Sequence, residues 1–249
     1  MSFLRLAGSA VFASAASLAL IATAHAQSPT RPQPRAVVEL FTSQGCSSCP
    51  PADRLLGDLA KDSSLVALTL PVDYWDYLGW KDTLASPKHS LRQRGYSAAR
   101  GDREVYTPQV VVNGVAHVLG SDKTAIERAI ANSSGKAMTV PVTLTVAGDK
   151  LTVSVPETAG VRGAIWLCGV ATTVPVAVAR GENSGRSLTY HNVGRRWLKV
   201  GDWDGKAQSW TVPASDLKAD GVDTAAALLQ GGSTEKPGPM LGAAVASLR

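Results

Sequence analysis

The sequence predicts an α/β domain followed by an all-β, sandwich-like domain, and the pattern of apolar and polar residues changes near residues 134–139. Before this point, apolar runs that suit buried strands alternate with segments of helical periodicity, which is typical of strand–helix–strand units. After it, short alternating runs are separated by Gly, Asp, Asn and Pro, which is typical of β-sandwiches and β-barrels. The two patterns predict domains over residues 36–135 and 138–249.

The first 26 residues have the pattern of a secretory signal peptide. Arg5 precedes an apolar run, and Ala24-His25-Ala26 resembles a cleavage site, so we expect cleavage near Ala26 and a periplasmic or secreted protein. No later segment approaches the roughly 20 apolar residues of a membrane-spanning helix, and no membrane anchor is expected. Residues 27–35 contain three prolines and no apolar periodicity, which predicts a disordered leader.

Charge and cysteine content narrow the class of protein further. The formal net charge is +5, but the charges are interspersed without a basic run, so nucleic acid is not an expected partner. The three cysteines allow one pair and one single residue, and export provides conditions in which disulfides persist. Cys168 lies in an apolar run of the second domain and is expected to be simply buried.

The first domain begins with a strand–helix–strand unit. The apolar, β-branched run over 36–42 predicts a buried strand, and residues 52–62 place three leucines on one helical face. Prolines at the start of this helix are tolerated because the first N–H groups have no intrahelical partner. The strand pattern returns over 63–74, so the two strands are expected to be parallel with a crossover helix.

The rest of the first domain is an inserted helix followed by two strands and a helix. The inserted helix is predicted from about residue 86 to 96. The next two strands join at Asn113-Gly114, which is a strong hairpin signal. The last helix follows Ser121 or Asp122 as its N-cap and ends near Gly135.

In the second domain, eight short runs are expected to form strands or strand-like segments. They are VPVTLTVAG, KLTVSVPE, GAIWLCGVA, VPVAVAR, SLTYHNVGRRWLKVG, SWTVPA, TAAALLQ and LGAAVASL. The polar stretches Arg180–Arg186 and Arg195–Trp197 lie among them and predict a polar patch, to which the sequence assigns no role.

The strongest chemical motif is Cys46-Ser47-Ser48-Cys49, which lies between the first predicted strand and helix. At a helix start, free N–H groups and the helix dipole favour a thiolate, so the pKa of the first cysteine can fall below the ~8.5 of a free thiol. The second cysteine is placed to attack a mixed disulfide on the first and release the partner. We therefore predict that Cys46 is the nucleophile and Cys49 the resolving thiol.

Two other interpretations of this pair stay open. The pair can be a plain structural disulfide, although closing so short a loop gains little entropy. It can also be half of a zinc or copper site, but a second such motif is absent and His89, His117 and His191 lack ligand spacing. We therefore predict no metal site and no cofactor.

The order of elements and the position of the cysteine pair resemble those of thioredoxin-like proteins. The resemblance implies that Pro108 is a cis proline against the cysteines and that Thr107 presents its backbone to a substrate strand. A trans proline that opens an edge strand is the alternative. The resemblance also suggests that Glu39 is a buried acid that exchanges a proton with Cys49, whereas a salt-bridged or edge-facing Glu39 is the alternative.

The chain also resembles a bacterial secreted family, domain of unknown function 1223. The matching stretches are VVELFTSQGCSSCPPAD, VDYWDYLGWKD, RQRGY, YTPQVVVNG, RGENSGRSLTYHNVGRRW and GPMLGAA. The family implies a thioredoxin-like domain plus a β-rich domain and no particular reaction. Unlike working thioredoxins, this chain has no Trp before Cys46 and has Ser-Ser between the cysteines.

The predicted substrate-binding residues lie between the cysteines and after the second strand. Ser47 and Ser48 separate the cysteines, and Tyr74 and Trp75 belong to an aromatic segment that is typical of recognition surfaces or of a loop folded over its own core. Together these features predict an exported thiol/disulfide oxidoreductase that acts on protein or small-molecule thiols and disulfides. The alternative is a non-catalytic envelope binding module, or a copper- or metal-handling protein, with the same fold.

Overall fold

The first strands and helix form the predicted strand–helix–strand unit. In the computed structural model, which describes Met1 and residues 33–249, β1 (Ala36–Thr42) lies parallel to β2 (Leu65–Pro71). The crossover between them is α1 (Pro50–Leu59), which begins with two prolines. Every residue of both strands is buried, because neighbouring elements cover both faces of the sheet.

Two further strands complete the thioredoxin-like part of the sheet. β3 (Gln109–Val112) lies antiparallel to β1, and β4 (Ala116–Leu119) lies antiparallel to β3. The chain reverses between them at Asn113 and Gly114, which both have positive φ angles of 50° and 71°. The sequence signal for a hairpin is therefore confirmed.

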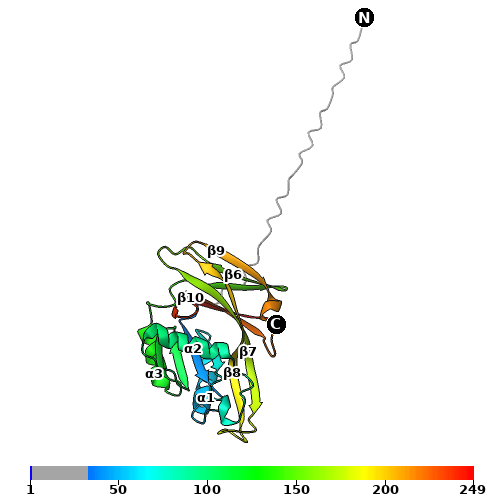
Figure 1. Cartoon of the computed structure of the whole chain (residues 1–249). Coiled ribbons are helices and arrows are strands. Elements are labelled where there is room, and N and C mark those ends of the chain that lie inside the picture. The colour runs from blue at the N-terminus through cyan, green and yellow to red at the C-terminus, as the bar shows by residue number, and fades with distance from the viewer. Residues whose placement is uncertain (2–32) are drawn as a thin grey trace. The chain divides into compact units, whose positions relative to one another are not determined.

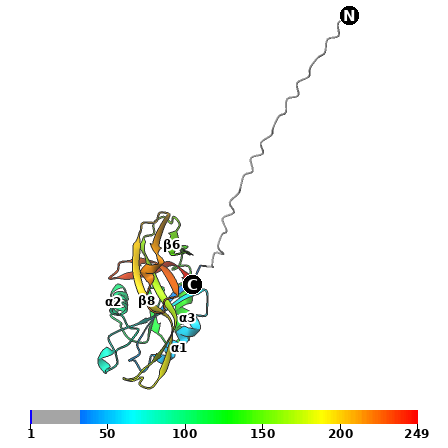
Figure 2. The same cartoon turned by 90° about the vertical axis from the view of Figure 1, so that its right-hand side faces the viewer.

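Helices cover both faces of this part of the sheet. α1 and α3 (Lys123–Asn132) pack on the face that carries Val38 and Leu40, and α2 (Pro87–Arg100) packs on the face of Val37 and Phe41. Figure 2 shows α2 on one side of the strands and α1 and α3 on the other. Ser86 and Asp122 cap the last two helices through their side chains.

The C-terminal region adds four long strands to the same sheet and a second, smaller sheet. The added strands are β7 (Gly163–Ala177), β8 (Ser187–Trp203), β10 (Thr224–Gly232) and β11 (Pro237–Ser247). The smaller sheet has the order β5 (Thr143–Ala147), β6 (Lys150–Val155) and β9 (Gln208–Pro213). Two 3-10 turns, η1 (Asp76–Leu78) and η2 (Ala214–Leu217), complete the described elements.

The large sheet runs through both regions in the order β11-β10-β7-β8-β2-β1-β3-β4. Its two parts meet where Thr69 of β2 pairs in parallel with Val193 of β8. In Figure 1 the helices gather around one end of the sheet, and β6 and β9 lie over the other. The apolar layer beneath the smaller sheet includes Leu151, Val153 and Leu167, so this part is sandwich-like.

The sequence predicted separate segments over 163–171 and 174–180, whereas the structure has one strand, β7, that contains most of both. Pro175 lies inside this strand opposite Thr189 of β8. The pairing of β7 with β10 ends at Val170. Beyond Val170, β7 pairs only with β8 within the described residues, so its other side is a sheet edge. A proline is tolerated at such an edge because its missing N–H removes no ladder hydrogen bond.

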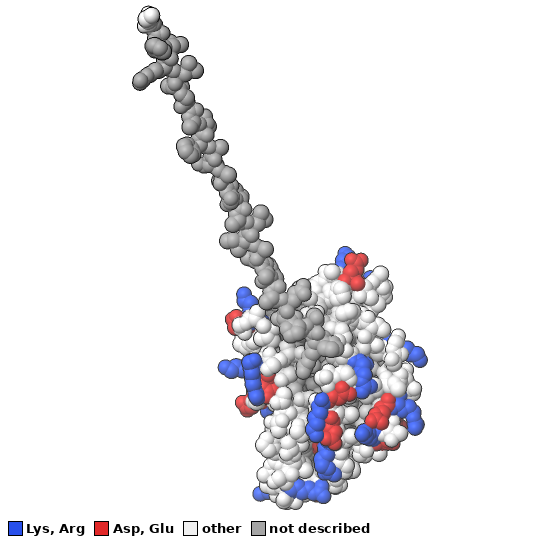
Figure 3. Space-filling model, turned by 180° about the vertical axis from the view of Figure 1, so that it is seen from behind, with Lys and Arg blue, Asp and Glu red and all other residues white. Residues whose placement is uncertain are grey.

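The N-terminal predictions lie mostly outside the described residues, which include only 33–35 of the predicted leader. There, the Gln33 side chain donates to the Val142 carbonyl at 3.0 Å, and Arg35 pairs with Asp62 at 3.0 Å. None of the helices in the described part is long and apolar enough to cross a membrane. Figure 3 shows Lys and Arg interspersed with Asp and Glu on one face of the molecule.

Candidate redox site

Cys46 and Cys49 form a disulfide at the start of α1. The loop from Ser43 to Cys49 joins β1 to this helix, with Cys49 at the N-cap position. The loop is held by its own backbone, because the Cys46 N–H donates to the Ser43 carbonyl at 3.2 Å. Both cysteines are buried, with exposed fractions of 1 % and 0 %, so the disulfide lies beneath other side chains.

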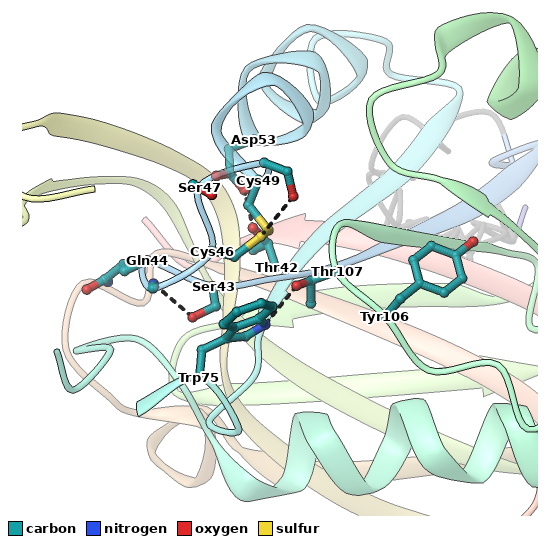
Figure 4. The surroundings of a disulfide bond; sticks show 12 residues. Thr42, Ser43, Gln44, Cys46, Ser47, Cys49, Asp53, Trp75, Tyr106 and Thr107 are labelled. Carbon is teal, nitrogen blue, oxygen red and sulfur yellow. Dashed lines mark hydrogen bonds between the residues drawn. A yellow bond between two sulfur atoms is a disulfide. The ribbon is translucent and has the colours of Figure 1, made fainter. Parts of the chain in front are cut away.

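Trp75 lies against the cysteine loop from the side opposite α1 (Figure 4). Its Nε1–H donates to Thr107 Oγ1 at 2.8 Å, which links the aromatic segment to the loop that precedes β3. A Cβ at position 45 would lie 3.1 Å from Trp75 Cβ, so Gly45 permits this close approach. The Thr107–Pro108 peptide bond is cis, as the resemblance to thioredoxin-like proteins implied, and Pro108 is buried.

The loop between β7 and β8, more than 130 positions further along the chain, lies against the cysteine loop. The Asn183 side chain is fully buried, and its Nδ2 donates to the carbonyls of Gln44 and Cys46 at 2.9 Å each. The neighbouring Glu182 carboxylate accepts from the Ser47 N–H at 3.0 Å. The polar stretch Arg180–Arg186, to which the sequence assigned no role, therefore holds the cysteine loop through hydrogen bonds of Asn183 and Glu182.

A buried carboxyl group lies one helical turn beyond Cys49. The Asp53 N–H donates to the Cys49 carbonyl at 3.1 Å, and its Oδ1 accepts from Thr42 Oγ1 at 2.7 Å. Figure 4 shows Asp53 on the α1 side of the disulfide. Burial raises the pKa of Asp53 from 3.8 to about 7, and the hydrogen bond from Thr42 opposes this shift.

The surroundings of Asp53 contain two further buried polar groups. Burial raises the pKa of Asp82, whose carboxylate accepts from the backbone N–H groups of Gln44 and Leu84. Burial and the nearby carboxyl groups of Asp53 and Asp82 also raise the pKa of Tyr190. Asp53 Oδ2 and Tyr190 Oη are buried without a hydrogen-bond partner within residues 33–249. No hydrogen bond from the described residues therefore stabilises a negative charge on Asp53 Oδ2, so this oxygen can carry a proton.

Glu39 lies on the opposite face of the sheet from α1. It shares its face of β1 with Val37 and Phe41, which pack beneath α2. Its carboxylate pairs with Arg92 Nε at 2.6 Å and accepts from the Tyr96 hydroxyl. The salt-bridged alternative therefore describes Glu39, and its partners come from α2 instead of the cysteine loop.

The remaining predicted site residues divide between the surface and the α2 face. Ser47 and Ser48 are exposed, and Ser48 Oγ lies 3.4 Å from Cys46 Sγ. Tyr74 packs against the core beneath α2, and its hydroxyl donates to Gln93 Oε1 at 3.1 Å. Burial raises the pKa of Tyr74 to about 12. Trp75 lies against Gly45 of the cysteine loop.

Sequence reasoning missed Asp53, Asn183 and Glu182. Asp53 looked like an ordinary acidic residue in the first turn of an amphipathic helix, where a negative charge is favourable. Asn183 and Glu182 lie more than 130 positions from the cysteines, and only their polar cluster in a β-rich region was a signal. Among the residues that the structure describes, no three His, Cys, Asp or Glu side chains group as a metal site would require.

The fold and the site define a protein with a thioredoxin-like beginning and a CxxC disulfide at its first helix. The chain belongs to the family described as protein of unknown function (DUF1223), which it matches over residues 37–230. Its structure is similar to the crystal structure of protein AGR_C_4864 from Agrobacterium tumefaciens, with 34% identity, a TM-score of 0.75 and coverage of 86% of this chain and 94% of that one.

A second solved structure, HBP35 of Porphyromonas gingivalis, shares the fold at 14% identity. Its TM-score is 0.60, and the match covers 87% of this chain and 76% of that chain. No curated protein matches the sequence. The comparisons therefore establish the family and the fold.

Proposed function

We propose that this protein is an exported thiol/disulfide oxidoreductase that uses Cys46 and Cys49 on protein or small-molecule thiols. The observation that carries the proposal is the disulfide at the start of α1 with the buried carboxyl group of Asp53 one turn beyond it, whose pKa burial raises to about 7. A structural disulfide needs no such acid. The signal-like pattern of the first 26 residues supports export, where disulfide chemistry is useful to a cell.

The reaction is a pair of thiol–disulfide exchanges. A substrate thiolate attacks Cys46 Sγ, a substrate–Cys46 disulfide forms, the Cys46–Cys49 bond breaks, and Cys49 leaves as a thiolate. The second substrate thiolate then attacks the substrate sulfur, and Cys46 leaves as a thiolate. Two electrons thus pass from the substrate dithiol to the cysteine pair. The same steps in reverse reduce a substrate disulfide.

Asp53 supplies the proton that this exchange requires. A pKa of about 7 lies close to the pKa of a free thiol, so transfer between Asp53 and the Cys49 thiolate costs little in either direction. Thr42, which donates to Asp53 Oδ1, holds the carboxyl in place. Asp53 takes the role that the resemblance to thioredoxin-like proteins suggested for Glu39.

The Cys49→Ala variant is expected to form a stable mixed disulfide through Cys46. Once Cys49 is absent, no internal thiol resolves the bond between Cys46 and its substrate. With glutathione disulfide as the probe, the reduced variant should gain one glutathione by intact-mass spectrometry, about tenfold faster than Cys46→Ala. The Cys46→Ala variant keeps Cys49 and the buried Cys168, so it reports background reactivity. Equal rates in the two variants would refute the catalytic role of Cys46.

Glu182→Gln is expected to make the cysteine pair more oxidising. The carboxylate occupies the Ser47 N–H beside Cys46, and its negative charge disfavours a thiolate there. Removing the charge stabilises the reduced pair, so the pKa of Cys46 falls and the reduction potential rises. Because Glu182 is exposed, we expect only about a two- to fivefold change in the equilibrium with dithiothreitol. Glu157→Gln, a change of the same type at an exposed position between β6 and β7, is the control, and a shift of the same size there would contradict the effect.

The burial of Cys46 favours a second candidate, a non-catalytic envelope binding module in which the disulfide is structural. In that case partner binding survives replacement of both cysteines by serine and fails when Trp75 is changed. The Cys49→Ala trapping experiment separates the two candidates, because a binding module gives no covalent adduct.

A further inference from the structure

A cavity of about 520 Å³ opens on the α2 face of the large sheet. Its walls come from α2, from the start of β7 and the end of β8, and from the end of β10 with the turn that leads to β11. The redox disulfide lies just before α1, which packs on the other face, so the cavity is separate from the redox site. Its volume falls within the range of small-molecule sites, roughly 300–1,000 Å³.

Two tryptophans and a cation line this cavity. Trp166 and Trp197 come from neighbouring strands, and the guanidinium of Arg92 lies 4.9 Å from the Trp197 ring centroid. Arg92 donates through Nε and Nη2 to Glu39, Tyr96 and Gln230 and makes no other hydrogen bond within the described part of the chain. Its Nη1 group is therefore available to a ligand.

The rim adds two lysines and two carboxylates. Lys199 is paired with Asp202 at 2.7 Å, and Glu235 accepts a hydrogen bond from Ser233 at 3.0 Å. Lys88 is exposed, and no carboxylate pairs with it in residues 33–249. The cations without a full set of partners, Lys88 and Arg92, thus both come from α2. Two aromatic walls beside two such cations suit an anion with an apolar body.

Irregular strand pairing shapes the same cavity. The β7–β8 register shifts between Ile165 and Trp166, where Trp166 pairs with Lys199. The β10–β11 register shifts on both sides of Gln230, beside Gly231. β-bulges of this kind re-aim side chains and are common next to binding sites. Both irregularities border one cavity, although they lie in different strand pairs.

We propose that this cavity binds a small organic anion with a planar apolar body. The body lies against Trp166 and Trp197, and the anionic group meets Arg92 and Lys88. The site is independent of the cysteine chemistry and gives the C-terminal strands a binding role of their own.

The test uses 1-anilinonaphthalene-8-sulfonate, a planar aromatic sulfonate, in a fluorescence titration of the purified, oxidised chain. We expect saturable one-to-one binding, and Lys88→Glu and Trp166→Leu should each weaken the affinity about three- to tenfold. Lys150→Glu and Trp210→Leu, which change the same residue types on the smaller sheet, should leave it unchanged. The neutral N-phenyl-1-naphthylamine shares the ring system and should bind more weakly than the sulfonate.

Three results would overturn the proposal: no saturable binding, equal weakening by the matched control variants, or equal affinity for the neutral and anionic probes. Near-ultraviolet circular dichroism of each variant shows that the tertiary packing is intact. Lys88 lies exposed in the first turn of α2, where a glutamate is favourable, so the Lys88→Glu variant is expected to fold.

Discussion

Asp53→Asn is expected to change how the stability of the protein depends on pH. Between pH 4 and pH 8, the variant should gain up to about 4 kcal/mol in free energy of unfolding relative to the wild type. The physical reason is that burial penalises the ionised carboxylate of Asp53, whereas an asparagine has no charge to bury.

The sign follows from proton linkage. The pKa of Asp53 is about 7 in the folded protein and 3.8 as its ordinary value, so between these values the folded state binds more protons than the unfolded state. Stability from this residue is therefore fully present below about pH 4 and is lost as the pH rises through 7. The variant lacks this loss, and the difference between the two proteins grows over the same window.

Urea unfolding of the oxidised proteins at several pH values between 4 and 8 measures this difference. Asp58→Asn is the matched control, because Asp58 lies on the same helix with its side chain exposed. Its pKa is lowered by Lys61, so it produces no loss of stability in this window. A wild type and an Asp53→Asn variant with parallel pH profiles would show that Asp53 is ionised normally.

Arg92→Met is expected to lower the free energy of unfolding by about 3–5 kcal/mol. The side chain of Glu39 is fully buried and Arg92 is 12 % exposed, and the Arg92 Nε lies 2.6 Å from Glu39 Oε1. Removing the arginine leaves the carboxylate in the core with the Tyr96 hydroxyl as its remaining side-chain donor among residues 33–249. A buried charge without its counter-charge is among the most destabilising changes in a protein.

Guanidinium unfolding at pH 7 measures the loss, and a double replacement shows its origin. Adding Glu39→Leu to Arg92→Met removes the orphaned charge and should recover much of the stability. Arg94→Met, on the exposed side of the same helix, should change the stability by no more than about 0.5 kcal/mol. The buried-pair explanation fails if Arg92→Met costs no more than Arg94→Met.

Local patterns were sufficient to predict most of the elements around the site. The apolar run before the cysteines forms β1 with the predicted bounds, and Ser86 caps the inserted helix that the sequence predicts there. Asn113-Gly114 makes the predicted reversal of the chain. These predictions hold because strand, cap and turn preferences depend on a few neighbouring residues.

Predictions that depended on side-chain direction or on distant contacts were less complete. Glu39 has the right burial, but the alternation of β1 places it with Val37 on the α2 face. Trp75 lies against the cysteine loop as an aromatic rim residue, whereas Tyr74 turns toward α2. Neighbouring residues in an irregular segment carry no periodicity that would tell these directions apart.

The sequence by itself determined the cysteine pair, the helix that begins after it and the order of strands that makes the fold thioredoxin-like. Only the tertiary structure decided that Asp53 is buried with a raised pKa and that Asn183 holds the Cys46 carbonyl. The reason is that burial and pairing depend on which distant segments pack together. Here the loop between β7 and β8 meets a loop that precedes it by more than 130 residues.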